Sequence, residues 1–354
     1  MLGTVACFCV SGYFYLKQQK QTEQNIAAFT PVADDCDKLA GIQRIVCLSE
    51  TFKATLTLEQ LKTTQLDYTM ANAEKWSNFP TTFRNAQRVG LKFGNMKPAQ
   101  IDAAKKLIKA VAGTSVNEGY DELLQLMNAD DYLATHDNRG DYGAGNYYIA
   151  FLGMPSATGM FEIQFGGHHM AFANTYKNGV LIGATPSFRG VEPFGKFAQN
   201  GRDNKPMDQE QSAFSALLAS FSADELSKAK LDRTFGDLVV GPQRDGQFPT
   251  TPSGIKCASL TTSQKQLVLK AIATYVDDID DADAAMYLNK YTKELNDTYV
   301  SFAGTTGMTT RNDYVRIDGP SLWIEYSCQG GIVLPGTHPH SVWRDKQSDY
   351  GGNK

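Results

Sequence analysis

The stretch around which the chain is organised reads GTHPHSVWRD and covers residues 336–345. It contains His338 and His340, and a second short piece, GGHH at residues 166–169, contributes His168 and His169. Together the two pieces hold four of the five histidines of the chain. Histidine is the side chain that most readily serves as a neutral metal ligand, or as an acid and base near pH 7. The two pieces therefore predict the location of a site, although they name no substrate.

Strand signals surround both pieces. Residues 314–317 and 322–326 are β-branched or aromatic runs, and the DGPS segment at 318–321 reads as the turn of a hairpin. Similar runs lie at 147–152, 160–165 and 178–182, whereas helices are expected in front of them and as a pair over 262–297. This order predicts an α+β fold with a mixed, mainly antiparallel sheet and flanking helices. No long linker interrupts residues 31–350, so we expect a single large domain there.

Helix-start signals recur with one layout. Residues 56–61 (LTLEQL) and 221–226 (FSADEL) each combine a capping box with a hydrophobic staple. Residues 260–264 carry the box alone, and Pro98 suits the first position of a helix. The spacings are too irregular for a solenoid repeat, so we interpret these signals as separate helices that begin alike.

The N-terminal residues 1–30 differ from the rest of the chain. Residues 2–16 (LGTVACFCVSGYFYL) carry no charge, and a polar spacer follows them. The run is shorter than the roughly 20 residues that a bilayer span needs, and it lacks a basic n-region. It predicts a targeting segment or a short anchor, with a plain core helix as the alternative. We therefore expect an exported protein (periplasmic, extracellular or lumenal) or a membrane-anchored one, with membrane contact through residues 2–16.

Cysteine usage agrees with export. Outside the apolar segment the chain has Cys36, Cys47, Cys257 and Cys328. Cys36 and Cys47 stand 11 residues apart in a polar stretch, which suits a small disulfide loop and leaves Cys257 and Cys328 as a second pair. In a reducing compartment all four would be buried thiols.

Charge excludes one class of partner. The formal net charge is -4, the isoelectric point is about 5.8, and the basic residues are scattered. A polyphosphate backbone needs a clustered basic surface, so we expect no nucleic-acid partner. A small molecule or a peptide remains as the substrate class.

Several motifs follow one another in an order that resembles an uncharacterised family, domain of unknown function 3500, over residues 50–350. They include WSNFP (76–80), GMPS (153–156), GGHHM (166–170), DTY (297–299), IDGPSL (317–322), IEY (324–326) and HPHSVWRD (338–345). Phe161 and Gln164 stand where the family pattern has a tryptophan and an arginine. The resemblance implies an alignment of motifs and no mechanism.

The mechanism must come from the residues. In an extended segment alternate side chains face the same way, so His338 and His340 are expected to address one ion. His168 shares its predicted face with Glu162 and is the preferred third ligand, whereas His169 would replace it if Gly166 and Gly167 form a bulge.

The candidate catalytic residues come from the same C-terminal region. Glu325 is expected as a fourth ligand or as a general base. Arg344 and Asp345 complete the candidate set, and we expect Arg344 to orient either an anionic group or the residues that surround the metal ligands.

These residues favour a metal-dependent enzyme, with zinc and hydrolysis ahead of copper or iron and redox chemistry. A metal-free acid and base site and a purely structural polar network are the alternatives for the histidines. The competing function is a non-catalytic binding module or accessory subunit of a membrane assembly.

Overall fold

The computed structural model describes residues 33–83 and 86–353. The predicted targeting segment at residues 2–16, with the rest of residues 1–30, lies outside this range. Within the described residues, no helix has both the length and the apolar character that a membrane span requires.

The α-helices are α2 (Ala33–Cys36), α3 (Gly41–Ala54), α4 (Leu58–Thr64), α5 (Met70–Ala73), α6 (Pro98–Ala110), α7 (Gly119–Ala134), α8 (Asp208–Ala219), α9 (Ala223–Ala229), α10 (Thr262–Val276) and α11 (Asp281–Glu294). Short 3-10 turns occur at η1 (Phe93–Asn95), η2 (Ala144–Asn146), η3 (Cys257–Ser259), η4 (Leu295–Asp297) and η5 (Asp349–Gly352). The strands are β1 (Gln65–Leu66), β2 (Leu91–Lys92), β3 (Tyr148–Leu152), β4 (Met160–Gly167), β5 (Met170–Lys177), β6 (Val180–Gly183), β7 (Ser187–Gly190), β8 (Phe197–Gln199), β9 (Arg202–Asn204), β10 (Ile255–Lys256), β11 (Tyr299–Ala303), β12 (Tyr314–Asp318), β13 (Leu322–Gly330) and β14 (Thr337–Asp345).

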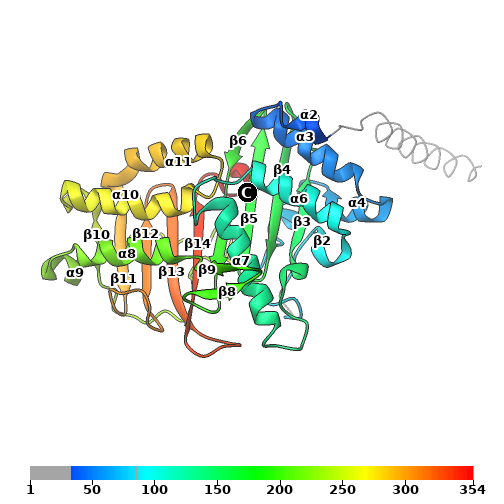
Figure 1. Ribbon diagram of the computed structural model, residues 1–354. Coiled ribbons are helices and arrows are strands. Elements are labelled where there is room, and N and C mark those ends of the chain that lie inside the picture. The colour runs from blue at the N-terminus through cyan, green and yellow to red at the C-terminus, as the bar shows by residue number, and fades with distance from the viewer. Residues whose placement is uncertain (1–32, 84–85, 354) are drawn as a thin grey trace, which may run out of the picture.

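One large sheet dominates the molecule (Figure 1). Its twelve strands run in the order β1-β3-β4-β5-β7-β14-β13-β12-β11-β10, with β2 beside β3 and β6 beside β5. The β1–β3 pair is parallel, and the other named pairs are antiparallel. The predicted α+β fold with a mixed, mainly antiparallel sheet is therefore confirmed.

Helices cover one face of this sheet, and Figure 1 shows α6, α7, α8 and α10 crossing it on the viewer's side. Trp343 of β14 points to that face, where its ring meets those of Tyr287 and Tyr291 on α11. Val342, the preceding residue, packs on the opposite face with Trp76 and other residues of a second core. Because side chains alternate along a strand, His338 and His340 share the face of Val342. We call it the loop face, because connecting segments cover it.

The fold contains an internal duplication. In each half a capped helix (α4 or α9) leads into residues that pair in parallel with β3 or β11, namely Gln65 with Phe151 and Lys230 with Phe302. The edge strand β2 or β10, two long helices and a three-stranded antiparallel meander follow in each half. Strands β7 and β14 close the two meanders and pair with each other at the centre of the sheet. The recurring helix starts open separate helices, as expected, and the structure places these helices at equivalent points of two halves with the same order of elements.

The local signals themselves are reproduced. Capping boxes form at Thr57, Ser222 and Thr261, each with its Gln or Glu three residues later. Pro98 occupies the first turn of α6. Local hydrogen bonds between a side chain and a nearby backbone amide decide these starts, which is why four residues suffice to predict them.

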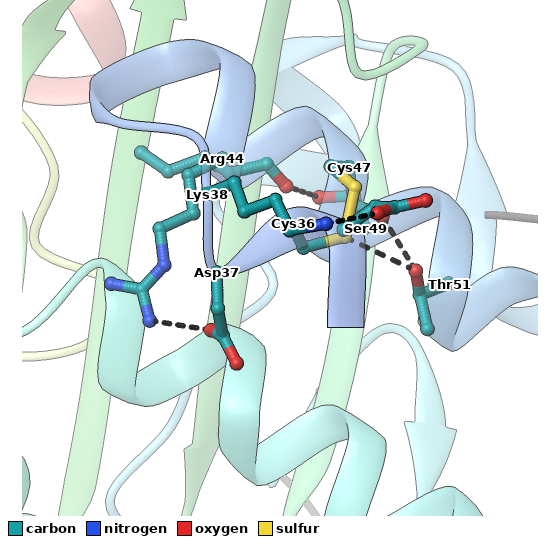
Figure 2. The surroundings of a disulfide bond; sticks show 9 residues. Cys36, Asp37, Lys38, Arg44, Cys47, Ser49 and Thr51 are labelled. Atoms are coloured by element: carbon teal, nitrogen blue, oxygen red, sulfur yellow. Dashed lines mark hydrogen bonds and ion pairs between the residues drawn. A yellow bond between two sulfur atoms is a disulfide. The ribbon is translucent and has the colours of Figure 1, made fainter. Parts of the chain in front are cut away.

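The two cysteine pairs have different outcomes. Cys36 and Cys47 form the expected disulfide, which joins α2 to α3 (Figure 2). The second predicted bridge is wrong, because Cys257 and Cys328 are free buried thiols. Cys257 follows β10 and Cys328 lies on β13, three strand spacings away in the sheet. That separation is roughly 14 Å, about twice the distance that a disulfide spans.

Candidate metal centre

His338 and His340 enter the site from β14, the central strand. His340 lies opposite Gly190 of β7, and a Cβ atom at Gly190 would stand 2.9 Å from the His340 ring and 3.2 Å from the His169 ring. The first contact is closer than Cβ atoms approach, and the second is tighter than most, so glycine leaves the room that the two imidazoles occupy. The pairing of β14 with β7 and the small size of Gly190 therefore let the β14 histidines lie against the turn between β4 and β5.

His168 and His169 form the two-residue turn between β4 and β5. The alternation of a pleated strand therefore ends before them, and His169 takes a left-handed backbone conformation with φ 64°. Tyr147 donates from its hydroxyl to the His168 carbonyl at 2.8 Å, and Gly190 donates from its N–H to the His169 carbonyl at 2.7 Å. Arg88 donates to the Gly167 carbonyl at 3.0 Å. The turn is thus held from several sides.

The turn brings His169 into the cluster. The Nε2 atom of His340 lies 3.2 Å from Nε2 of His338 and 3.2 Å from Nε2 of His169. The three ligand atoms lie within 4.8 Å of one another, and no other His, Cys, Asp or Glu of the described residues joins this group. Two nitrogens on a tetrahedral ion with bonds of about 2.0–2.1 Å stand about 3.3 Å apart. Two edges of the cluster therefore have the spacing of a tetrahedral zinc site.

His168 stands beside the cluster instead of in it. Its ring stacks on that of His169 with centroids 3.6 Å apart, and its Nδ1 lies 2.7 Å from the Asp130 carboxylate. Asp130 comes from α7 and also accepts the Gly143 N–H at 2.9 Å. Burial raises the pKa of Asp130, and its interaction with His168 opposes that rise. The structure thus brings together His169, His338 and His340, with His168 in the next layer.

Asp237 supports His340 from outside the cluster. Its carboxylate lies 3.0 Å from His340 Nδ1, so that Nδ1 donates and Nε2 presents its lone pair to the other histidines. Partial desolvation opposes the ionisation of the half-exposed Asp237, but His340, the Leu238 N–H and His338 together outweigh it and leave the pKa of Asp237 below its ordinary value. No sequence motif marks Asp237, because it is 103 residues from His340 in the chain.

Two imidazoles of the cluster, those of His169 and His338, have lowered pKa values and are neutral near pH 7. Burial, followed by the neighbouring histidines, lowers the pKa of His169 well below its ordinary value. The same causes lower the pKa of His338 to about 3. A neutral imidazole is the form that binds a metal ion.

Glu325 does not join the histidines. Its carboxylate accepts four hydrogen bonds, at 2.6–2.8 Å, from the N–H groups of Val239 and Val240, the Tyr314 hydroxyl and the Trp323 indole. Burial raises its pKa, and these four donors oppose that rise. Glu325 therefore anchors the segment that carries Asp237.

Arg344 and Asp345 lie further along β14. Arg344 is fully buried, pairs with Asp349 at 2.8 Å and Asp245 at 2.7 Å, and stands four residues from His340, roughly 13 Å along a strand. Asp345 points to the helix face, where its carboxylate accepts from Lys290 at 2.7 Å. Both are tied into ion pairs away from the histidine cluster.

A cleft of about 360 Å³ adjoins the cluster. Asp237 and Phe188 line the cleft and also contact the cluster, because Asp237 binds His340 and the Phe188 ring meets the His340 ring edge-on at 5.5 Å. The remaining wall comes from two connecting segments and consists of Asn78, Phe79, Leu238, Gly241, Pro242, Gln243 and Arg244. Sequence reasoning missed this wall, since neither segment carries a strand or helix pattern.

A second group of acids lies on the helix face. Glu118, Glu122 and Asp278 bring their carboxylates within 4.8 Å of one another. Arg189 passes among them and pairs with Glu122, with Asp278 and also with Glu210. Burial and the neighbouring acids raise the pKa of Glu118 to about 10. Glu122 and Asp278 are thus engaged by a buried arginine, so the histidine cluster is the stronger candidate.

The chain belongs to the family described as protein of unknown function (DUF3500), whose model matches residues 38–352. The resemblance seen in the sequence motifs is thereby confirmed over nearly the whole described region. No match to the chain was found among curated proteins or among solved structures. Family membership brings no assigned activity with it, so the function must be argued from the site.

Proposed function

We propose that this DUF3500 protein is an exported zinc-dependent hydrolase, with His169, His338 and His340 as the metal ligands. The observation that carries the proposal is the spacing of 3.2 Å between His340 Nε2 and the Nε2 atoms of both other histidines, beside an accessible cleft.

A metal ion explains this spacing better than a hydrogen-bonded network does. His340 uses its Nδ1 hydrogen for Asp237, so its Nε2 offers one lone pair in the ring plane. One lone pair accepts one good hydrogen bond, but two Nε2 atoms face it at 3.2 Å. A cation that takes up the lone pairs of all three rings satisfies them together.

The ligand set favours zinc and hydrolysis. Three histidines with a fourth position for water are typical of catalytic zinc, whereas a structural zinc site usually has four protein ligands. When bound, such an ion supplies a strongly polarised water at neutral pH. No thiolate of the described residues joins the cluster, so a soft ligand set that tunes redox potential is missing there.

This chain's own residues would supply orientation and access. Asp237 fixes the tautomer of His340, and His168, held by Asp130, buttresses the His169 ring. In the hydrolytic step the oxygen of water bonds to the substrate's electrophilic centre, the bond to the leaving group breaks, and the leaving group takes the proton.

Export is part of the proposal. The Cys36–Cys47 disulfide is compatible with an oxidising compartment, and the uncharged run at residues 2–16 suits targeting or anchoring. Thiol mapping of protein from its native source tests this part, because finding Cys36 and Cys47 reduced there would contradict it.

Metal analysis of the purified protein tests the site. We expect about one equivalent of zinc in the wild type and a large loss in His169→Ala, His338→Ala and His340→Ala. His136→Ala is the matched control, because His136 is the remaining histidine and is exposed, with its Nδ1 near the Tyr132 carbonyl. A folded wild-type protein that contains less than about half an equivalent of any transition metal would refute the proposed metal site. Copper or iron in place of zinc would sink the zinc assignment.

Turnover separates an enzyme from a binding module. We expect cleavage of 4-nitrophenyl esters that chelation abolishes, that added zinc restores, and that His340→Ala lacks. A protein that binds zinc and shows no metal-dependent cleavage of ester, amide or phosphoester probes would count against a hydrolase.

A further inference from the structure

The cleft beside the histidine cluster carries a charge pattern that points to its ligand. Two ionisable side chains, Asp237 and Arg244, line it. Asp237 is engaged with His340 Nδ1 at 3.0 Å. Arg244 is exposed, and its guanidinium donates to the neutral side chain of Gln247 at 3.2 Å. Arg244 is therefore the cation that faces a ligand in this cleft.

Other arginines near the site are already occupied. Arg88 donates to the carbonyls of Ser77, Phe79 and Gly167, and Arg344 pairs with Asp245 and Asp349. By contrast, no carboxylate of the described residues forms an ion pair with Arg244. A planar guanidinium without a carboxylate partner is suited to bind one from a ligand in a bidentate manner.

Apolar and polar side chains share the rest of the cleft wall. Phe188 is fully buried and contributes its ring, and Phe79, Leu238 and Pro242 stand around it. The volume of about 360 Å³ is that of a small-molecule site and leaves little room for a folded protein surface or a polymer. An apolar group of the size of a phenyl ring fits this chemistry.

We propose that the cleft binds a small carboxylate-bearing substrate, with Arg244 holding the carboxylate and the Phe188 side of the cleft holding an adjoining apolar group. This inference rests on the proposed function, because it supplies the substrate class for the same site. A divalent ion held by the three histidines would add positive charge beside Arg244, which would favour an anionic ligand further.

Binding of two matched probes to the full chain tests the proposal. The probes are 3-phenylpropanoate and its neutral isostere 3-phenylpropanamide, and calorimetry measures both on zinc-free and zinc-loaded protein. We expect the carboxylate to bind at least about tenfold more tightly than the amide, and Arg244→Gln to remove that preference. Arg233→Gln is the control, because Arg233 is an exposed arginine of the same connecting segment and stacks on Phe235 outside the cleft.

Measurements on zinc-free and on zinc-loaded protein distinguish a failure of this proposal from a failure of the metal-site proposal. Arg244 is not a ligand, so its preference for the carboxylate should persist in zinc-free protein even if zinc uptake fails. Equal binding of both probes, absence of binding by either, or equal losses in Arg244→Gln and Arg233→Gln would each overturn it. A preference that needs zinc and survives Arg244→Gln would also overturn it, since the carboxylate would then bind the ion alone.

Discussion

Replacement of Glu325 by glutamine probes how the sheet positions the metal ligands. The Glu325 carboxylate accepts from Val239 N–H and Tyr314 hydroxyl on one oxygen, and from Val240 N–H and Trp323 indole on the other. Glutamine keeps the shape but turns one oxygen into an NH2 donor. The Tyr314 hydroxyl can rotate and accept from that NH2, whereas a backbone or indole N–H cannot. We therefore expect the amide to face Tyr314 and Val239, and the Val239 N–H to lose its acceptor.

The energetic cost follows from that one lost bond. A buried donor without its acceptor costs about 1–3 kcal/mol, so the free energy of unfolding should fall by that amount. Val239 lies two residues after Asp237, whose carboxylate holds His340 Nδ1. Loosening the segment should weaken this support, and the loss of such an outer partner typically lowers metal affinity by about 10–100-fold. We expect Glu325→Gln to lower zinc affinity by about tenfold and Asp237→Ala to lower it somewhat more.

Competition with a chromophoric chelator measures zinc affinity in Glu325→Gln, Asp237→Ala and the double variant, and urea unfolding measures stability. If Glu325 acts through Asp237, the double variant should lose little more affinity than Asp237→Ala alone. Strictly additive losses, or an unchanged zinc affinity in a destabilised Glu325→Gln, would refute this reasoning. A loss of more than about 1000-fold would instead restore Glu325 as a direct ligand.

Three further predictions concern stability. Burial raises the pKa of Glu162 to about 8 from the ordinary value of 4.5, so the folded state holds a proton that the unfolded state releases between these values. The free energy of unfolding should therefore fall as pH rises through that window, by up to about 5 kcal/mol. Urea titrations at pH 5 and pH 9 should show this loss in the wild type and not in Glu162→Gln. The same loss in both proteins would contradict the prediction. Reduction of the Cys36–Cys47 disulfide, which closes a loop with a separation of 11 residues, should lower the free energy of unfolding by about 3 kcal/mol, and an unchanged urea midpoint would speak against it. Arg344→Met leaves Asp245 and Asp349 without their cation, so thermal unfolding should report a loss of about 3–5 kcal/mol; a loss below about 1 kcal/mol would mean that the pairs are solvent-screened.

Much of the candidate site could be predicted from the chain. Residues i and i+2 of a strand share a face whatever the fold. The sequence spacing alone therefore predicts that His338 and His340 point the same way. The preference for His168 over His169 as the third ligand is not reflected in the cluster. That preference assumed that strand β4 continues through residues 168 and 169. These residues form a two-residue turn instead, where side chains no longer alternate between the two faces.

The sequence departs from the family pattern at Phe161 and Gln164, and the structure shows the contacts of both side chains. Gln164 donates from its side chain to the Ala73 carbonyl at 2.7 Å and so ties the loop face to α5. Phe161 stacks on Tyr176 with ring centroids 5.2 Å apart. Neither side chain belongs to the histidine cluster or to the cleft wall.

The sequence by itself determined the helix starts, the α+β class, the first disulfide and the two histidine pieces. Each of these depends on residues a few positions apart, whose hydrogen bonds and face-sharing are decided locally. Tertiary structure decided the rest. It placed β14 beside β7, which brought His340 against His169 across 171 residues of chain, and it delivered Asp237 and Arg244 on a segment without a periodic pattern. Long-range pairing of two duplicated halves produces these contacts, and no local rule encodes which turn meets which strand.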